Sequence, residues 1–237
     1  MLNFKTKLQD KKEIAEGTMA FYVDKPEGFE HRAGQFVDVT LLGMPEGDNV
    51  HAFSIASAPD EDKLMIATRI RSESTFKQTL KNMAIGSEIE ISEPIGDFVL
   101  HNDKNRIAVF LIGGIGITPV RSMIVDATHR QLPNKIFLFY SNRRPEDSPF
   151  LSELENLQQQ NSNYKLITTM TDENLSTTWE GEKGYITADM IKSYVSDISM
   201  VTWYMSGPLA MVKAMRDILV SMGIDSDYIR TEEFSGY

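Results

Sequence analysis

A turn rich in glycine, residues 113–118, follows a run of six apolar residues, 107–112, and leads into Pro119. The apolar run predicts a strand buried on both faces. Glycines allow a sharp turn and bring backbone N–H groups close to a ligand. Pro119 favours a helix start, and a helix N-terminus beside bare amides binds phosphate. We expect a phosphate site here, although a strand-to-helix turn without a ligand has the same pattern.

A second segment of interest lies far upstream, at residues 51–59, and combines His51, Phe53 and Ser54. A Phe-Ser pair alone is typical of a core strand. Four further short segments of interest lie elsewhere in the chain. In order, the quoted segments are Gly34-Gln35-Phe36, His51-Ala52-Phe53-Ser54, Pro94-Ile95-Gly96-Asp97-Phe98, Gly113-Gly114-Ile115-Gly116-Ile117-Thr118-Pro119, Ser206-Gly207-Pro208 with Met211, and Glu233-Phe234.

In this order and at this spacing, the segments resemble the ferredoxin–NADP reductase superfamily, and the resemblance covers nearly the whole chain. Each segment alone is short and weakly specific for the family, and the resemblance becomes specific because all six occur in this order. The resemblance implies a flavin-binding barrel followed by a nicotinamide-binding domain. It also implies an oxidoreductase that moves a hydride from nicotinamide C4 to flavin N5.

The distribution of strand and helix patterns predicts two domains. Short strands between turns over the first hundred residues indicate a small barrel. From about residue 104, strands alternate with helices, which is typical of a doubly wound parallel sheet. We therefore predict an N-terminal antiparallel β-barrel at residues 1–101, which the resemblance implies is the FAD-binding domain. A C-terminal α/β doubly wound parallel sheet follows at 104–237, with polar residues 102–105 at the joint, and the resemblance implies that it binds NAD(P).

Local patterns place the individual elements. The expected strands are 36–41, 64–70, 86–91, 107–112, 135–140, 165–170, 200–205 and 228–234. The expected helices are 74–83, 119–130, 149–160, 187–195 and 209–222, the last ending at Gly223.

Composition excludes several classes of function. The chain has no cysteine, so it has neither disulfides nor a cysteine-ligated cluster. Its four histidines lack metal-ligand spacing, and its net charge of −10 disfavours general nucleic-acid binding. No apolar run has the length of a membrane span, and residues 1–5 lack a signal-peptide core, so we expect a cytoplasmic protein.

The resemblance implies a set of flavin contacts. Ser54 is the partner of flavin N5, and Phe53 is the aromatic residue along the ring system. His51 stands where the family has arginine, and it lacks the planar five-donor fork of arginine. The phosphates would then depend on the start of the helix near residue 74 and on basic neighbours. The candidates there are Ser74, Thr75, Arg69 and Arg71.

The resemblance also implies the nicotinamide contacts. The cradle for the pyrophosphate is formed by Gly113, Gly114, Gly116, Thr118 and Pro119, together with Gly207 and Pro208. Ser206 replaces the family's cysteine beside the nicotinamide. Arg143 and Arg144 favour NADPH, but nearby Glu146 and Asp147 weaken this preference, so NADPH and NADH both remain candidates.

An aromatic residue near the C-terminus is expected to lie against the flavin face that the nicotinamide approaches. Phe234 matches the family position, and Tyr237 is the second candidate, although a terminal tyrosine is also typical of a frayed end. The expected catalytic residues are therefore Ser54, Ser206 and Phe234.

The expected function is an NAD(P)H-dependent flavoprotein that passes electrons from FAD to a separate small carrier, such as a ferredoxin or flavodoxin, or to a small-molecule acceptor. One alternative is a flavin reductase that uses flavin as a diffusible substrate. Another is a non-enzymatic regulatory subunit that binds flavin or nucleotide. A basic cluster within residues 69–81 would dock an acidic partner or would simply be solvated. Its members are Arg69, Arg71, Lys77 and Lys81.

Overall fold

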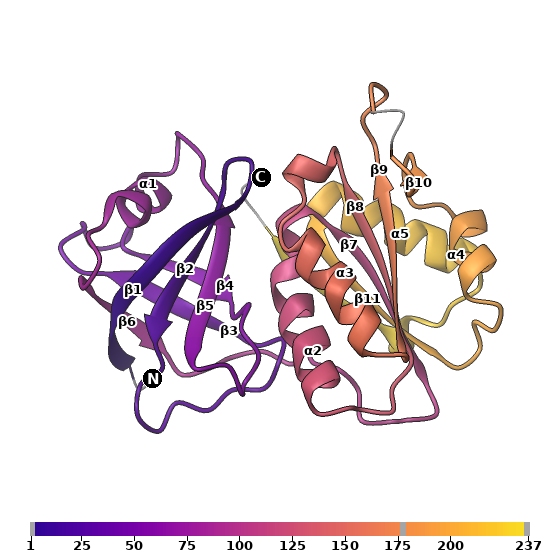
Figure 1. Cartoon of the computed structure of the whole chain (residues 1–237), viewed down its shortest axis with the longest axis horizontal. Helices are drawn as coiled ribbons and strands as arrows, with labels where there is room; N and C mark the ends of the chain where they lie inside the picture. The colour runs from indigo at the N-terminus through magenta and orange to yellow at the C-terminus, as the bar shows by residue number, and fades with distance from the viewer. Residues whose placement is uncertain (1–2, 176–178, 235–237) are drawn as a thin grey trace. The chain divides into compact units, whose positions relative to one another are not determined.

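The computed structural model describes residues 3–175 and 179–234, which form two compact units (Figure 1). The first, called here the barrel unit, comprises the chain up to Val99 together with Thr118–Asp126. The second, called the sheet unit, comprises Leu100–Ile117 and the chain from Ala127 onward.

The barrel unit is built from six antiparallel strands in the order β4-β3-β6-β1-β2-β5. A bridge between Ile55 and Ile66 joins the two outer strands, and the Ala56 N–H donates to the Met65 carbonyl at 2.7 Å. The sheet is thereby closed into the predicted barrel. The strands are β1 (Asn3–Ala15), β2 (Thr18–Asp24), β3 (Phe36–Leu41), β4 (Val50–Ser54), β5 (Lys63–Arg69) and β6 (Glu88–Ser92).

The barrel core takes alternate residues from these strands, because successive side chains point to opposite faces. Phe21, Val39 and Ile89 are almost completely buried there. The helix α1 (Thr75–Asn82) adds Phe76 and Leu80 to the same cluster. The aromatic residues of β4 therefore have a fixed partner in α1.

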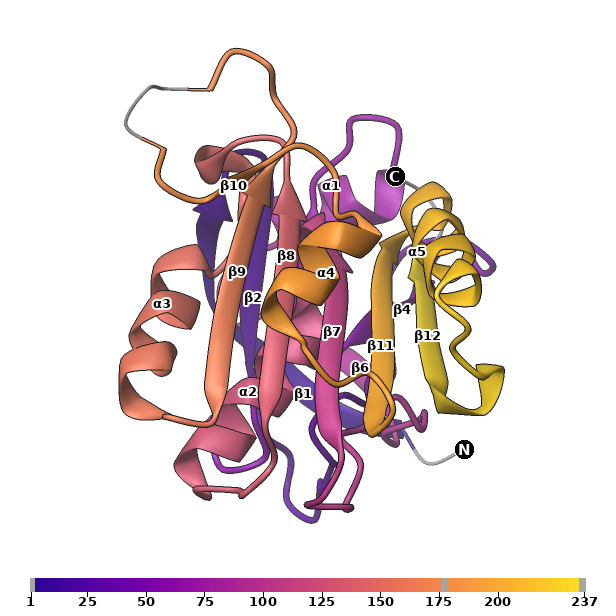
Figure 2. The same cartoon turned by 90° about the vertical axis from the view of Figure 1, so that its right-hand side faces the viewer.

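The sheet unit is a six-stranded parallel sheet in the order β10-β9-β8-β7-β11-β12. Figure 2 shows α3 on one face of this sheet and α4 and α5 on the other. The strands are β7 (Ile107–Gly113), β8 (Ile136–Asn142), β9 (Tyr164–Met170), β10 (Glu182–Lys183), β11 (Val201–Pro208) and β12 (Ile229–Phe234). The helices of this unit are α3 (Leu151–Gln160), α4 (Ala188–Tyr194) and α5 (Leu209–Ser221). The helix α2 (Ile117–His129) contributes only its two ends, because its middle, Thr118–Asp126, belongs to the barrel unit.

The order of strands reverses at β7, which has β8 on one side and β11 on the other. In open parallel sheets, ligands bind at the carboxyl ends of the strands where the order reverses. The glycine turn lies at the carboxyl end of β7, as a 3-10 turn, η1 (Gly114–Gly116), that leads into α2. The fold thus places the predicted cradle at the switch point.

The helix after this turn starts two residues earlier than predicted, at Ile117 rather than Pro119. Pro119 is accommodated in the first turn because an N–H at that position has no partner inside the helix.

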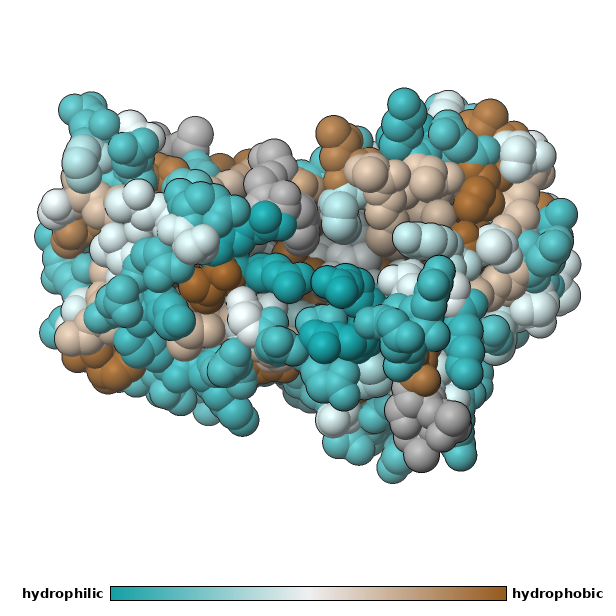
Figure 3. Space-filling model, turned by 90° about the horizontal axis from the view of Figure 1, so that it is seen from above, coloured by the Kyte–Doolittle hydropathy of each residue, from teal (hydrophilic) through white to brown (hydrophobic). Residues whose placement is uncertain are grey.

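The surface is largely polar. The face shown in Figure 3 is mostly hydrophilic, with apolar residues in small separate patches. Large exposed apolar side chains include Leu209 at the start of α5 and Tyr185 beside β10. Apolar residues exposed in this scattered way are normal for globular proteins.

Gly34, which precedes β3, provides a test of the barrel packing. It has φ +101°, and a Cβ there would collide with the Phe98 carbonyl oxygen and come within 2.7 Å of Met123 Cε. We expect Gly34→Ala to lower the free energy of unfolding by about 3 kcal/mol or more, from strain plus overpacking. Gly28→Ala is the control, because Gly28 has φ +76° with no atom within 4 Å. If urea denaturation gave equal losses of unfolding free energy for the two variants, this description of the packing around Gly34 would be contradicted.

Candidate functional site

The carboxyl ends of β7 and β11 bring two distant turns into direct contact. A Cβ on Gly116 would lie 2.5 Å from the carbonyl carbon and oxygen of Ser206 and 2.6 Å from Gly207 N. Gly207 has φ +150°, and a Cβ there would lie 3.0 Å from the Gly113 carbonyl oxygen. Side chains at these positions would push the two turns apart, so glycine is required for the contact.

Gly114 has a different environment within the same turn. Its φ is +53°, and a Cβ there would meet no atom within 4 Å. The Tyr140 hydroxyl, 3.3 Å from the Gly114 carbonyl oxygen, supports the turn from the β8 side. The turn is therefore tightly packed at Gly113 and Gly116 and open at Gly114, which suits a cradle for a phosphate group.

Ser206 lies near the carboxyl end of β11 and is fully buried. Among the residues that the structure describes, its Oγ has no hydrogen-bond partner. A buried hydroxyl without a partner costs about 1–3 kcal/mol, so such a group marks a position where a ligand can supply the missing bond. The sequence predicted Ser206 as a site residue, and the structure places it against the glycine turn.

The other predicted residues of this edge lie on neighbouring strands. Phe234 is half-buried and lies opposite Pro208 where β12 pairs with β11. Ser141 of β8 lies opposite Gly113, and Arg143 and Arg144 follow directly after β8. Tyr237 lies outside the described residues.

Arg144 forms an ion pair with Asp147, one of the two acidic neighbours that weaken the predicted preference for NADPH. Its Nε lies 3.0 Å from Asp147 Oδ2 and its Nη2 lies 3.1 Å from Oδ1, so the contact is bidentate. The Asp147 side chain is only 7% exposed. Arg143 is exposed, and its carbonyl accepts a hydrogen bond from the Asp172 N–H. The guanidinium of Arg144 is thus already neutralised by a carboxylate.

The predicted flavin contacts lie in the barrel unit, on β4. His51 and Phe53 share one side of the strand and pack on Phe76 of α1, with ring centroids 4.4 Å and 5.8 Å from the Phe76 ring. Partial burial and the Lys77 ammonium lower the pKa of His51, so its ring is neutral at pH 7. Ser54 is buried. The family's arginine is thus replaced by a neutral ring in an aromatic cluster.

The candidates for binding phosphate lie around the start of α1. Ser74 is the N-cap, and its Oγ accepts from the Lys77 N–H at 3.3 Å, while Thr75 is the first helical residue. Arg69 is exposed at the end of β5. Arg71 lies 3.5 Å from Glu73 in an ion pair at the surface. Such pairs contribute little, so Arg71 is available to a ligand.

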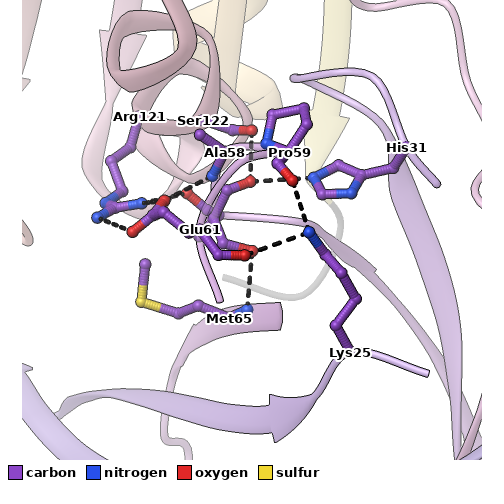
Figure 4. Close-up of polar contacts among 10 residues, drawn as sticks. Lys25, His31, Ala58, Pro59, Glu61, Met65, Arg121 and Ser122 are labelled. Carbon is purple, nitrogen blue, oxygen red and sulfur yellow. Dashed lines mark hydrogen bonds and ion pairs between the residues drawn. The ribbon is translucent and has the colours of Figure 1, made fainter. Parts of the chain in front are cut away.

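Sequence reasoning missed Glu61 and Arg121, which form an ion pair within the barrel unit (Figure 4). Glu61 follows the predicted flavin segment, and Arg121 follows Thr118 in α2. Their spacing of 60 residues carries no sequence signal, so only the fold reveals the pair.

Comparison with known proteins agrees with this arrangement. Residues 110–217 match the oxidoreductase NAD-binding domain family. That range runs from within β7 to within α5 and includes both turns of the candidate site.

Two sequence relatives are components of reductase systems. One belongs to the Na(+)-translocating NADH-quinone reductase of Pseudoalteromonas atlantica; the chain is 26% identical to it over 230 residues, covering 90% of this chain and 55% of the relative. The other is the reductase component of the glycine betaine monooxygenase of Chromohalobacter salexigens, 27% identical over 221 residues, covering 92% and 60%. The chain therefore spans little more than half of these relatives.

Solved structures share the fold across almost the whole chain. An Amycolatopsis cytochrome P450 reductase superposes with a TM-score of 0.84 at 22% identity, covering 98% of this chain and 70% of the other. A ferredoxin NADP+ reductase from Neisseria gonorrhoeae, solved with bound FAD and NADP, has a TM-score of 0.81 at 20% identity and covers 98% of both chains. The two-unit fold predicted from the resemblance to the ferredoxin–NADP reductase superfamily is confirmed by these structures.

No helix within residues 3–175 and 179–234 combines the length and apolar character needed to cross a membrane.

Gly114→Ala tests the cradle. The new methyl group would project into the open side of the turn, so we expect nicotinamide-nucleotide binding to weaken about tenfold, while strain lowers the stability by about 1 kcal/mol. Gly223→Ala is the control, because Gly223 has φ +78° with no atom within 4 Å and follows α5, away from this turn. Isothermal titration measures binding, and equal binding by the two variants would contradict the assignment.

Proposed function

We propose that the chain is an NAD(P)H-dependent flavoprotein oxidoreductase that transfers a hydride from the nicotinamide to FAD and delivers electrons to a separate acceptor. The observation that carries this proposal is the contact of the two turns at the β7/β11 edge, where Ser206 Oγ is buried without a partner among the described residues. The match of residues 110–217 to the NAD-binding domain family supports it.

The sheet unit would hold the nicotinamide nucleotide. The turn from Gly113 to Ile117 would bind the pyrophosphate through backbone N–H groups. Ser206 would hydrogen-bond a polar group of the nicotinamide, and Phe234 would shield the reacting faces from water. The residues fit this group, since they combine an open cradle with a buried hydroxyl that lacks a partner in the described part of the chain.

The barrel unit would hold FAD. Ser54 would face flavin N5, and the exposed ring of His51, which packs on the buried rings of Phe53 and Phe76, would offer an apolar surface to the cofactor. The start of α1 at Ser74 and the exposed guanidinium of Arg69 would neutralise phosphate. When bound, FAD supplies the chemistry that accepts two electrons from a hydride and releases them to the acceptor.

A flavin reductase is the second candidate, and the structure offers one observation in its favour. The position of the family's arginine is taken by His51, whose ring packs on Phe76 and is neutral at pH 7 because its pKa is lowered. Without that guanidinium, the adenylate half of FAD loses a bidentate phosphate contact, so flavin is held less tightly. Flavin that co-elutes with the protein in gel filtration favours the flavoprotein oxidoreductase with bound FAD. Flavin that separates from the protein favours the flavin reductase, which uses flavin as a diffusible substrate.

The electron acceptor is proposed to be a separate redox carrier, such as a ferredoxin or flavodoxin, or a small molecule. Both sequence relatives named above are components of larger reductase or monooxygenase systems. The basic residues around α1 are the proposed docking face for an acidic carrier, with Lys81 exposed and Lys77 half-buried. A cytoplasmic location is proposed because the hydride donor is a cytoplasmic nucleotide.

Anaerobic stopped-flow absorbance tests the function. We expect FAD to bind and its visible band to bleach on mixing with NADH or NADPH. Ser206→Ala should slow the bleaching about tenfold, because it removes the bond to the nicotinamide. Ser221→Ala is the matched control, because the Ser221 hydroxyl bonds within α5, to the Ile218 carbonyl at 2.7 Å. Protein that binds no flavin, or bleaching equally fast in both variants, would refute the proposal.

The Arg144–Asp147 pair makes a prediction about nucleotide choice. Asp147→Asn removes the carboxylate that neutralises Arg144, so the guanidinium becomes available to a 2′-phosphate. We expect the affinity for 2′,5′-ADP to rise about tenfold relative to 5′-ADP, measured by isothermal titration. Asp217→Asn is the control, because Asp217 is an exposed carboxylate on α5. A ratio that does not change would show that Arg144 lies out of reach of the ribose.

A further inference from the structure

The segment of residues 57–62, which connects the β4 side of the barrel to β5, is fastened by side chains (Figure 4). The Ser57 carbonyl accepts from Ser122 Oγ at 2.6 Å and from His31 Nε2 at 3.2 Å. Lys25 Nζ donates to the Pro59 carbonyl at 2.5 Å and to the Glu61 carbonyl at 3.2 Å. The backbone directly after Ser54 is therefore fixed by groups from other elements.

The centre of this network is a bidentate ion pair. Arg121 Nη1 lies 2.6 Å from Glu61 Oε2, and Nη2 lies 3.0 Å from Oε1. Arg121 also donates to the Ala56 carbonyl at 2.9 Å, and Glu61 Oε2 accepts from the Ala58 N–H at 2.6 Å. The side chains are 7% and 28% exposed for Arg121 and Glu61. All of these residues belong to the barrel unit.

The pair connects two segments that carry proposed ligand contacts. Arg121 lies three residues after Thr118, in the first turns of α2, and Ala56 lies two residues after Ser54. A buried ion pair is a weak source of net stability, because desolvation offsets its attraction. Its directional bonds nonetheless fix geometry, since a bidentate contact allows only one relative placement of the two groups.

We propose that Glu61 and Arg121 are positioning residues for hydride transfer, acting through Ser54 and Thr118. The ion pair holds the backbone after Ser54 and the start of α2 in one arrangement, so that the Ser54 hydroxyl keeps a single orientation toward flavin N5. This inference rests on the proposed function. It assigns neither residue a contact with the cofactor.

The test compares Glu61→Gln with Glu88→Gln. Glu88 forms an exposed ion pair with Lys5 at 3.1 Å in the same unit and lies on β6, outside the fastened segment. Loss of positioning should slow flavin reduction at saturating nucleotide about tenfold, while KM changes by less than about twofold. The visible circular dichroism of bound flavin should change, and amide exchange over residues 57–62 should become faster, in Glu61→Gln alone.

Arg121→Gln and the double variant Glu61→Gln/Arg121→Gln, together with the wild type and Glu61→Gln, complete a double-mutant cycle. If the residues act as one unit, the double variant is no slower than the slower single variant. Arg121→Lys replaces Arg121→Gln if the latter does not fold, and it should retain part of the rate because it keeps one charged bond.

Several outcomes would overturn the inference. They are a Glu61→Gln rate equal to that of Glu88→Gln, rate losses that multiply in the double variant, or unchanged flavin dichroism and amide exchange. If wild-type protein with bound flavin is reduced by neither NADH nor NADPH, the proposed function itself fails and the inference falls with it. Normal wild-type reduction with an unaffected Glu61→Gln variant refutes the positioning role alone.

Discussion

The structure depends on a close backbone contact between two turns at the carboxyl ends of β7 and β11. Gly116 lies against the Ser206 carbonyl, and Gly207 lies against Gly113, at separations that leave no space for a side chain. This contact is available only where strand order reverses, because only there do two crossover connections leave the sheet in opposite directions. One side of Gly114 is open and the Ser206 hydroxyl is buried at this edge, and we propose that these two features allow the edge to bind a nucleotide.

Much of the fold could be predicted because the local patterns are strong. The strand at 36–41 coincides with β3, and the alternation of strands and helices after residue 104 identified the parallel sheet. The first two strands were not predicted. Six of the 13 residues of β1 are charged and only Thr6 and Leu8 are buried, so the alternation of buried and exposed residues is short. Such a strand is defined by its two neighbours, β2 and β6, and not by its own sequence.

The candidate site was predictable where a residue type is dictated by backbone geometry. Gly113 and Gly116 could be found in this way, whereas Ser206 and Gly207 were predicted from the resemblance of residues 206–208 to an element of the family. Contacts between side chains that lie far apart in the sequence could not be predicted from it. The packing of His51 on Phe76 and the pairing of Glu61 with Arg121 arise from tertiary placement. Asp147, which neutralises Arg144, lies only three residues away and was noted in the sequence. We propose that these contacts affect cofactor affinity, the choice of nucleotide and the orientation of Ser54. The glycines instead determine which class of ligand the site can bind.

A crystal structure of the protein with FAD and a nicotinamide nucleotide would show directly whether the nucleotide binds at the carboxyl ends of β7 and β11. We expect the pyrophosphate on the turn between Gly113 and Ile117, with a polar atom of the nicotinamide within hydrogen-bond distance of Ser206 Oγ. A nucleotide bound at another edge of the sheet, or a Ser206 hydroxyl that stays without a partner beside a bound nucleotide, would contradict this expectation.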